Sequence, residues 1–170
     1  MKWKMIVAMN EKGVIGLNDR LPWRIPEDIA WYQSQTDGQL MLMGRKTFES
    51  IRRRPEGSHY IVLSKSLDPK DFEGQDVTII RDLSELDSLS LSGEGWVCGG
   101  ATLYKQMLEH CEDLFLSEVY GDHEGDVHFP KFSEHYHLHK VTLEHEQFSV
   151  KHYVNNNHQQ MKHLRQKKRG

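Results

Sequence analysis

The chain has 170 residues, of which 37% are hydrophobic and 28% are charged, and its formal net charge is −3. This length favours one domain with a real hydrophobic core, and no apolar run approaches the length needed to cross a bilayer. The apolar run after Met1 is short and ends at polar residues, which argues against a signal peptide. Two cysteines, Cys98 and Cys111, are too few for a disulfide framework and favour a reducing cytoplasm.

The predicted elements of the first half alternate between strand and helix. In chain order they are a strand over 3–9, a loop over 11–23, a helix over 26–36, a buried strand over 40–43, a short helix over 45–51, a loop over 52–58, and strands over 59–63 and 77–80. Pro26 fits the first position of its helix, where a missing N–H costs nothing.

The second half continues the alternation and then changes character. It contains a short helix over 83–89 capped by Asp82, a strand over 96–98, a helix over 101–109, a strand over 114–119, and an antiparallel pair over 135–143 and 148–154. The pattern predicts a single-domain α/β fold. Its central sheet is mostly parallel, with helices on both faces and a C-terminal antiparallel hairpin.

Charge is distributed unevenly between the body and the C-terminus. Residues 158–170 carry five basic residues and no acid, and without them 17 basic residues face 25 acidic ones, a formal charge of −8. An acidic body argues against nucleic acid as the main partner. We therefore expect a domain over 1–157 and a basic, frayed tail over 158–170, although such a tail can also touch RNA or phosphate surfaces.

One acid, Asp28, lies in an apolar and aromatic segment that runs from Leu21 to Tyr32. The predicted helix places Asp28 in its first turn, with Tyr32 one turn later on the same face. Acids are common in first turns because they complement the helix dipole. From this segment alone, Asp28 is equally well interpreted as a helix-end charge or as a site acid.

Three predicted strand ends carry residues suited to phosphate. Gly44 precedes Arg45, Lys46 and Thr47 at a helix start, Gly99-Gly100 separates a strand from a helix, and Ser64-Lys65 ends another strand. Ligands of open α/β sheets bind at the carboxyl ends of the strands. Neither standard nucleotide fingerprint is present, so each motif is weak alone, but together they favour a polyphosphate cofactor.

These motifs, with their order and spacing over about residues 4–154, closely resemble the dihydrofolate reductase family. The matching pieces are Ile6-Val-Ala8, Gly13-Val-Ile-Gly16, Leu21-Pro-Trp23, Pro26-Glu-Asp28, Trp31-Tyr32, Met43-Gly-Arg-Lys-Thr-Phe-Glu-Ser-Ile51, Ile61-Val-Leu-Ser64, Gly99-Gly100 with Tyr104, and Glu124-Gly-Asp-Val-His-Phe-Pro130. The resemblance implies NADPH-dependent reduction of 7,8-dihydrofolate to 5,6,7,8-tetrahydrofolate in one-carbon metabolism. Hydride would be transferred to pterin C6, and a proton would be transferred to N5.

The resemblance also implies roles for individual residues. Asp28 would hold the pterin's 2-amino group and adjacent ring nitrogen, supported by Ser117, where the family usually has threonine. Leu21 and Trp23 would belong to a mobile loop over the nicotinamide, and Asp126 would clasp that loop. The implied substrate-binding residues are Ile6, Ala8, Asp28, Tyr32, Ile51, Arg53 and Ser117.

The cofactor is expected to be NADPH, because Arg45, Ser64 and Lys65 together would favour its 2′-phosphate. The implied cofactor-binding residues are Ala8, Ile15, Gly16, Gly44, Arg45, Lys46, Thr47, Ser64, Lys65, Cys98, Gly99, Gly100, Ala101, Thr102, Leu103 and Tyr104. The family joins its glycine pair by a cis peptide, so Gly99-Gly100 is expected to be cis. Thr102 stands where the family often has a further basic residue.

The main departure from the family lies in the loop 51–59. Members usually carry, after Gly57, an arginine that binds the α-carboxylate of the substrate's glutamate tail, and here that position is Ser58. Losing such a pair, worth on the order of 1.5–3 kcal/mol, would raise KM roughly tenfold to a hundredfold. We therefore expect weak recognition of the tail, with Arg53 or Arg54 as partial replacements. Cys98 also departs from the family's branched or aromatic residue, with consequences for antifolate binding.

Two alternative functions stay open on the sequence. A related pyrimidine reductase of riboflavin synthesis would share fold and cofactor, but its members lack the Leu-Pro-Trp and Pro-Glu-Asp patterns. A pterin- or NADPH-binding protein with little turnover is kept open by Ser58. His135, His137 and His139 share a strand face at metal-ligand spacing, but no fourth ligand is evident, so no metal is expected. A monomer is the expected state.

Overall fold

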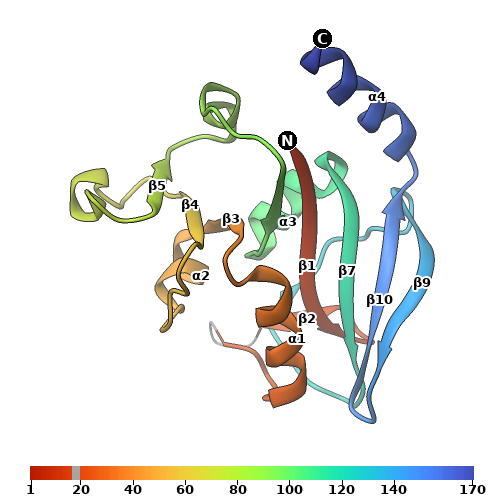
Figure 1. Ribbon diagram of the computed structural model, residues 1–170. Coiled ribbons are helices and arrows are strands. Elements are labelled where there is room, and N and C mark those ends of the chain that lie inside the picture. The colour runs from red at the N-terminus through yellow and green to blue at the C-terminus, as the bar shows by residue number, and fades with distance from the viewer. Residues whose placement is uncertain (17–19) are drawn as a thin grey trace.

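The computed structural model describes residues 1–16 and 20–170 (Figure 1). The main sheet contains β1 (Lys2–Asn10), β3 (Leu40–Gly44), β4 (His59–Leu63), β5 (Val77–Ile80), β6 (Glu94–Val97), β7 (Cys111–Val119), β9 (Tyr136–Glu144) and β10 (Phe148–Asn155). Their order across the sheet is β5-β4-β3-β6-β1-β7-β10-β9. Neighbours from β5 to β7 are parallel, whereas β10 is antiparallel to both β7 and β9. The predicted fold class is therefore confirmed.

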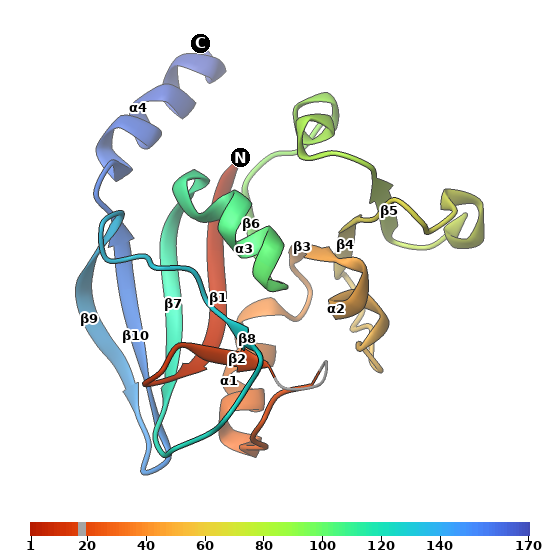
Figure 2. The same cartoon turned by 180° about the vertical axis from the view of Figure 1, so that it is seen from behind.

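Helices α1 (Pro26–Thr36) and α3 (Ala101–Met107) cover opposite faces of the sheet, as the two views show (Figures 1 and 2). The short helix α2 (Arg45–Glu49) follows β3 directly. Short 3₁₀ helices lie at Pro69–Phe72, Leu83–Ser88 and Leu108–His110. The central strands are nearly continuous apolar runs because both faces are covered, and Met5, Leu42, Ile61 and Val97 have no exposed surface.

The loop predicted over 11–23 contains a strand. β2 (Val14–Gly16) pairs with β8 (Val127–His128), and residues 17–19 of the same loop lie outside the described residues. The pattern did not reveal β2 because a three-residue strand gives too short an alternation. Asp82 does cap the segment after it, accepting from the Ser84 N–H at 2.8 Å, but that segment is a 3₁₀ helix.

The C-terminal segment, predicted to be a frayed tail, forms the helix α4 (His158–Arg169). Arg165 forms an ion pair with Glu112, whose side chain is only 7% exposed. That contact attaches one turn of α4 to the start of β7, although the helix projects beyond the sheet (Figure 1). The sequence did not predict this helix, because the ion pair between Arg165 and Glu112 joins residues that are far apart in the chain.

Candidate functional site

Asp28 occupies the first turn of α1, immediately after Pro26, and is 8% exposed. Its backbone N–H donates to the Ile25 carbonyl at 3.1 Å, and Ile25 itself provides no side-chain cap. An acid serving only the helix dipole would remain in solvent, since burial of a charge is costly. The burial of Asp28 therefore favours the site acid over the helix-end charge.

Burial raises the pKa of the Asp28 carboxyl, and a hydrogen bond from the Ser117 hydroxyl opposes this by lowering it. Ser117 lies on β7 opposite Ala8 of β1 and is 3% exposed. The pairing of two central strands thus fixes the hydroxyl that faces the acid. A carboxylate with one neutral donor retains acceptor capacity for a ligand's N–H groups.

Tyr32 follows Asp28 by one turn and packs with Cys98 and Ile6. An interaction between the Tyr32 hydroxyl and the Cys98 thiol, just after β6, contributes to the pKa of both groups. Burial raises the pKa of Tyr32 and raises that of Cys98 to about 12, so both groups stay protonated at neutral pH. The structure therefore brings together the acid and aromatic residue of α1 with the ends of β6 and β7.

Two indole N–H groups near this helix are buried without a hydrogen-bond partner, those of Trp23 and Trp31. An unsatisfied buried donor costs about 1–3 kcal/mol, so it marks a place where a ligand or water supplies an acceptor. Trp23 is a predicted site residue, whereas the sequence analysis predicts no donor role for Trp31. Leu21, two residues before Trp23, is 51% exposed, as suits a residue that meets a ligand instead of the core.

The segment before Trp23 is fastened to the segment 121–129. Asp126 N donates to the Gly16 carbonyl at 3.0 Å, and Phe129 N donates to the Gly13 carbonyl at 2.8 Å. Asn10, which the sequence analysis missed, is fully buried and donates to the His123 carbonyl at 2.7 Å. The ring of His123 lies 5.2 Å from that of Trp23. The backbone of Asp126 thus contacts this segment, and the clasp by its carboxylate stays a prediction.

Three residues, two of them basic, directly follow the ends of neighbouring strands. Gly44 pairs with Leu63, and Leu63 pairs with Ile80, so Arg45, Ser64 and Arg81 follow these partners at one edge. Arg81 was missed by sequence reasoning and donates to the Ser64 carbonyl at 2.7 Å. Arg45 pairs with Glu49 at 3.0 Å, and Lys65 is exposed. The sequence feature that could have identified Arg81 is its position directly after a predicted strand.

The Ser64 hydroxyl forms hydrogen bonds within the protein. It is 6% exposed, and its hydroxyl accepts from the backbone N–H groups of Ser66 at 3.2 Å and Leu67 at 3.1 Å. These bonds form the turn after β4. Both acceptor sites of this hydroxyl are thus engaged within the protein, and its O–H group is what it can offer to a ligand.

The Gly99–Gly100 peptide bond is cis, which confirms the prediction. The Gly99 carbonyl accepts from Gly44 N at 2.8 Å, so the ends of β3 and β6 meet. Gly99 has φ of 110°, and a Cβ there would lie 3.2 Å from the Tyr104 hydroxyl, so no larger residue fits without strain. Tyr104 in turn donates to the Ile6 carbonyl at 2.7 Å.

The remaining predicted site residues differ in their surroundings. Ala8, Ile15, Ile51, Thr47 and Ala101 are half-buried, Ile6 and Gly16 are buried, and Lys46 and Thr102 are exposed. Leu103 is 3% exposed and belongs to the main core cluster, so its side chain packs inside the protein.

The far end of α1 is solvent-exposed and rich in charge. Arg53 donates to Asp37 at 2.9 Å, and Arg54 donates to Gln75 at 2.7 Å while lying over the Phe48 ring. Ser58 is 3% exposed, and its hydroxyl accepts from Gly38 N at 2.8 Å. Ser58 therefore supports the turn after α1, and no charge replaces the expected arginine at that position.

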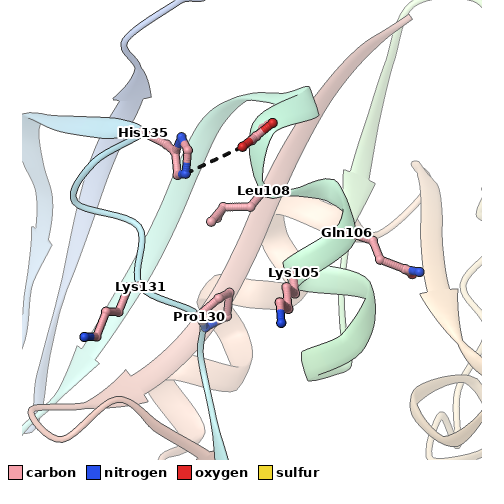
Figure 3. A pocket seen from close by; sticks show the side chains of 7 residues that line it. Lys105, Gln106, Leu108, Pro130, Lys131 and His135 are labelled. Carbon is pink, nitrogen blue, oxygen red and sulfur yellow. Dashed lines mark ion pairs between the residues drawn. The ribbon is translucent and has the colours of Figure 1, made fainter.

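A surface hollow of about 460 Å³ lies between α3 and the segment 130–135 (Figure 3). Its residues are Lys105, Gln106, Leu108, Glu109, Pro130, Lys131 and His135. None of them is a predicted site residue. His135 in it lies 3.8 Å from Glu109, and within residues 1–16 and 20–170 no His, Cys, Asp and Glu group could hold a metal ion. No helix in those ranges is long and apolar enough to cross a membrane.

Comparisons with known proteins agree with this geometry. The dihydrofolate reductase family model matches residues 2–163. The chain is 38% identical over 130 residues to dihydrofolate reductase of Bacillus subtilis, covering 76% of each chain. It is 34% identical over 139 residues to that of Haemophilus influenzae, covering 78% of this chain and 81% of the relative.

A solved structure of dihydrofolate reductase from Enterococcus faecalis, complexed with NADP(H) and RAB-propyl, has the same fold. Its TM-score is 0.75 at 24% identity, over 91% of this chain and 96% of that one.

Proposed function

Because this chain belongs to the dihydrofolate reductase family and reduces 7,8-dihydrofolate to 5,6,7,8-tetrahydrofolate with NADPH, we propose that Asp28 anchors the pterin. The observation that carries this proposal is the buried Asp28 carboxyl at the start of α1, whose pKa the neutral Ser117 hydroxyl of β7 lowers. Its free acceptor sites match the pterin's 2-amino group and adjacent ring N–H.

Asp28 also favours the protonated, hydride-accepting pterin. An anion in apolar surroundings stabilises a neighbouring cation more than it would in water. The raised pKa of Asp28 supports this, because its unpartnered charge is disfavoured until a cation or N–H donors arrive. Ser117 keeps the carboxylate oriented, and Tyr32, Ile6, Ala8 and Ile51 form the walls that hold the ring flat.

Trp23 and Leu21 form the lid in this proposal. The unpartnered indole N–H of Trp23 donates to the substrate or to a water that contacts it. Closure of the exposed Leu21 over the rings excludes bulk water, which strengthens the electrostatic effect of Asp28. Asp126 holds the lid through its backbone bond to Gly16.

NADPH, when bound, supplies the hydride for pterin C6. The donors on this chain fit its phosphates: Arg45, Lys65 and Arg81 follow adjacent strands, and Arg81 is our addition to the expected set. Thr47 and the glycines around Gly99 provide small, polar surfaces for the diphosphate. The further residues assigned to the cofactor are Ile15, Gly16, Gly44, Lys46, Ser64, Cys98, Gly100, Ala101, Thr102, Leu103 and Tyr104, with Leu103 contributing through its backbone because its side chain is in the core.

Changing Arg81 to Gln tests that addition. If Arg81 contacts the 2′-phosphate, the variant loses about tenfold in its preference for NADPH over NADH, because one charge-assisted bond contributes about 1.5–3 kcal/mol. Lys70→Gln, a change of an exposed cation elsewhere, is the matched control. An unchanged ratio of kcat/KM for the two cofactors contradicts the assignment.

The glutamate tail of the substrate is weakly recognised in this proposal. Arg53 is already paired with Asp37, and Ser58 is buried and uncharged, so neither residue supplies a free cation for the tail. We propose a cytoplasmic monomer that also binds antifolates through Asp28.

A binding protein with little turnover is the second candidate, favoured only by Ser58. Oxidation of NADPH followed at 340 nm with dihydrofolate, beside Asp28→Asn, separates the two. The enzyme assignment predicts turnover that this substitution nearly abolishes. Intact NADPH binding without turnover would favour the binding protein, and turnover unaffected by Asp28→Asn would contradict the role of Asp28.

A further inference from the structure

The C-terminal helix α4 carries a charge opposite to that of the rest of the chain. Five of its 12 residues are basic and none is acidic, whereas residues 1–157 have a formal charge of −8. Arg165 faces the body of the protein, where it pairs with the buried Glu112. The other four cations are exposed, and within residues 1–16 and 20–170 they form no ion pair. They are Lys162, Lys167, Lys168 and Arg169.

The helix lies at the end of the sheet away from the cofactor site. β10 is antiparallel to β7 and ends at Asn155, so α4 follows at the amino ends of the parallel strands, beside Glu112. The residues assigned to the cofactor phosphates follow the carboxyl ends of those strands. Figure 1 shows α4 projecting beyond the sheet. Its cations therefore need an explanation other than cofactor binding.

Helix stability explains only part of this composition. Cations in the last turn complement the helix dipole, which accounts for Lys167, Lys168 and Arg169. The same dipole favours acids in the first turn, but α4 has none there, and Asn157 provides no side-chain cap. Burial lowers the pKa of Arg165, and the charge of Arg169, four residues later, lowers it further. Like charges at this spacing destabilise an isolated helix, so the arrangement favours an anionic partner.

The composition of α4 also indicates the kind of anion. Its apolar residues are Met161 and Leu164, too few for the apolar face that inserts into a membrane surface. It has no Phe, Tyr or Trp on which unpaired bases could stack. The cations from Lys162 to Arg169 extend over roughly 10 Å of the helix axis. A nucleic-acid duplex presents roughly six phosphate charges over that length.

We propose that α4 binds nucleic-acid duplexes through their phosphate backbone, without reading the base sequence. The four exposed cations replace counterions of the duplex, and the ion pair of Arg165 with Glu112 holds the helix in place on the body. The negative charge of the body repels a duplex, which limits the contact to the helix. This binding is additional to the reduction of dihydrofolate and does not depend on it.

Fluorescence anisotropy of a labelled DNA duplex of about 20 base pairs, titrated with the full chain in about 50 to 200 mM salt, tests the proposal. The α4 variant combines Lys162→Gln, Lys167→Gln, Lys168→Gln and Arg169→Gln. A charge-matched control combines Lys70→Gln, Lys105→Gln, Lys131→Gln and Lys140→Gln, which change exposed lysines elsewhere. A third variant, with Lys162→Arg, Lys167→Arg and Lys168→Arg, keeps every charge. Thermal unfolding checks that each variant is folded.

We expect the unmodified chain to bind with a Kd of about 10⁻⁴ M or lower in about 50 mM salt. Its affinity should fall about a hundredfold by about 200 mM, because four neutralised phosphates give a logarithmic slope of about −3.6. The α4 variant should lose at least about tenfold in low salt, while the control and the arginine variant stay within about threefold. A duplex of shuffled sequence should bind equally well, and all variants should reduce dihydrofolate at the unmodified rate.

Three results would overturn the proposal: no binding of the duplex in low salt, equal losses in the α4 variant and the control, or an affinity that does not depend on salt. Tighter binding to vesicles of anionic phospholipid than to the duplex would also overturn it, since the partner would then be a membrane surface. A chain that binds the duplex through α4 but does not reduce dihydrofolate supports this proposal and contradicts the proposed function, so the two failures are distinguishable.

Discussion

The two ends of helix α1 handle charge in opposite ways. At its start, Asp28 is buried, and burial raises the pKa of its carboxyl while the neutral Ser117 hydroxyl lowers it. At its end, about 13 Å further along the axis, Asp37 and Arg53 pair with one another in solvent. An ion pair in water contributes little, whereas a single charge in an apolar site interacts strongly with whatever binds beside it. The buried end can therefore do chemistry, and the exposed end can at most adjust affinity.

The largest effect is expected at the buried end. Asp28→Asn keeps the size of the side chain but removes its charge, so kcat/KM for dihydrofolate should fall by about 10²–10⁴-fold, the range for a positioned acid or base. Steady-state assays at 340 nm measure this. Asp37→Asn, the same change at the exposed end of the helix, is the matched control and should cost less than about threefold. Equal losses in the two variants would remove the distinction between the ends.

A smaller effect is expected for the hydroxyl that faces Asp28. Ser117→Ala removes one hydrogen bond, so kcat/KM should fall about twofold to tenfold. Because that bond lowers the pKa of Asp28, its loss should move the acid limb of the pH profile upward. Ser117→Thr keeps the hydroxyl and should behave like the unmodified chain. An alanine variant with an unchanged pH profile would show that Ser117 has no influence on the acid.

At the exposed end, Arg53→Ala should raise KM for dihydrofolate by less than about fivefold, because a solvent-exposed pair contributes about 0–1 kcal/mol. The change should disappear with a substrate that lacks the glutamate tail. A rise of more than tenfold would mean that Arg53 replaces the missing arginine fully.

The test of Ser58 needs two variants, because the Ser58 hydroxyl also accepts a hydrogen bond from Gly38 N. Ser58→Ala removes that bond without adding a cation, so the KM ratio between Ser58→Arg and Ser58→Ala isolates the charge. We expect the arginine variant to have the lower KM of the two, by about tenfold or more. Equal KM values would contradict the idea that the tail lacks a cation.

The smallest effect concerns stability. The folded-state pKa of Asp28 is raised by burial, so folding favours its protonated form and stability falls as pH rises from the unfolded-state pKa through the folded-state one. Asp28→Asn lacks this penalty and should melt at a higher temperature than the unmodified chain at pH 7. The difference in melting temperature between the two proteins should disappear as pH falls below about 3.9. Thermal unfolding at several pH values measures it, and a less stable variant at pH 7 would contradict the raised pKa.

Much of this arrangement was predictable from local patterns. The strand–helix alternation gives the parallel sheet because buried strands are continuous apolar runs, and Pro26 gives the start of α1. Asp28 alone was ambiguous, since its burial depends on β1 and β7, which the local sequence does not contain. The family resemblance supplied that missing information.

Contacts between segments that lie far apart in the chain could not be predicted from the sequence. Ser58 is buried where its hydroxyl meets Gly38, and Arg81 lies beside Ser64 because β4 pairs with β5. Helix α4 is attached because Arg165 meets Glu112. Each depends on strand order or on the packing of a remote partner, which periodicity does not encode.

Carbon-13 NMR of aspartate-labelled protein, with Asp28→Asn to assign the signal, tests the role of Asp28 most directly. In the free protein the Asp28 carboxyl should titrate above its ordinary value of about 3.9. With folate and NADP⁺ bound, its pKa should fall, because the pterin's N–H donors stabilise the charged form. A titration that folate leaves unchanged would contradict the assignment of Asp28 as the pterin anchor.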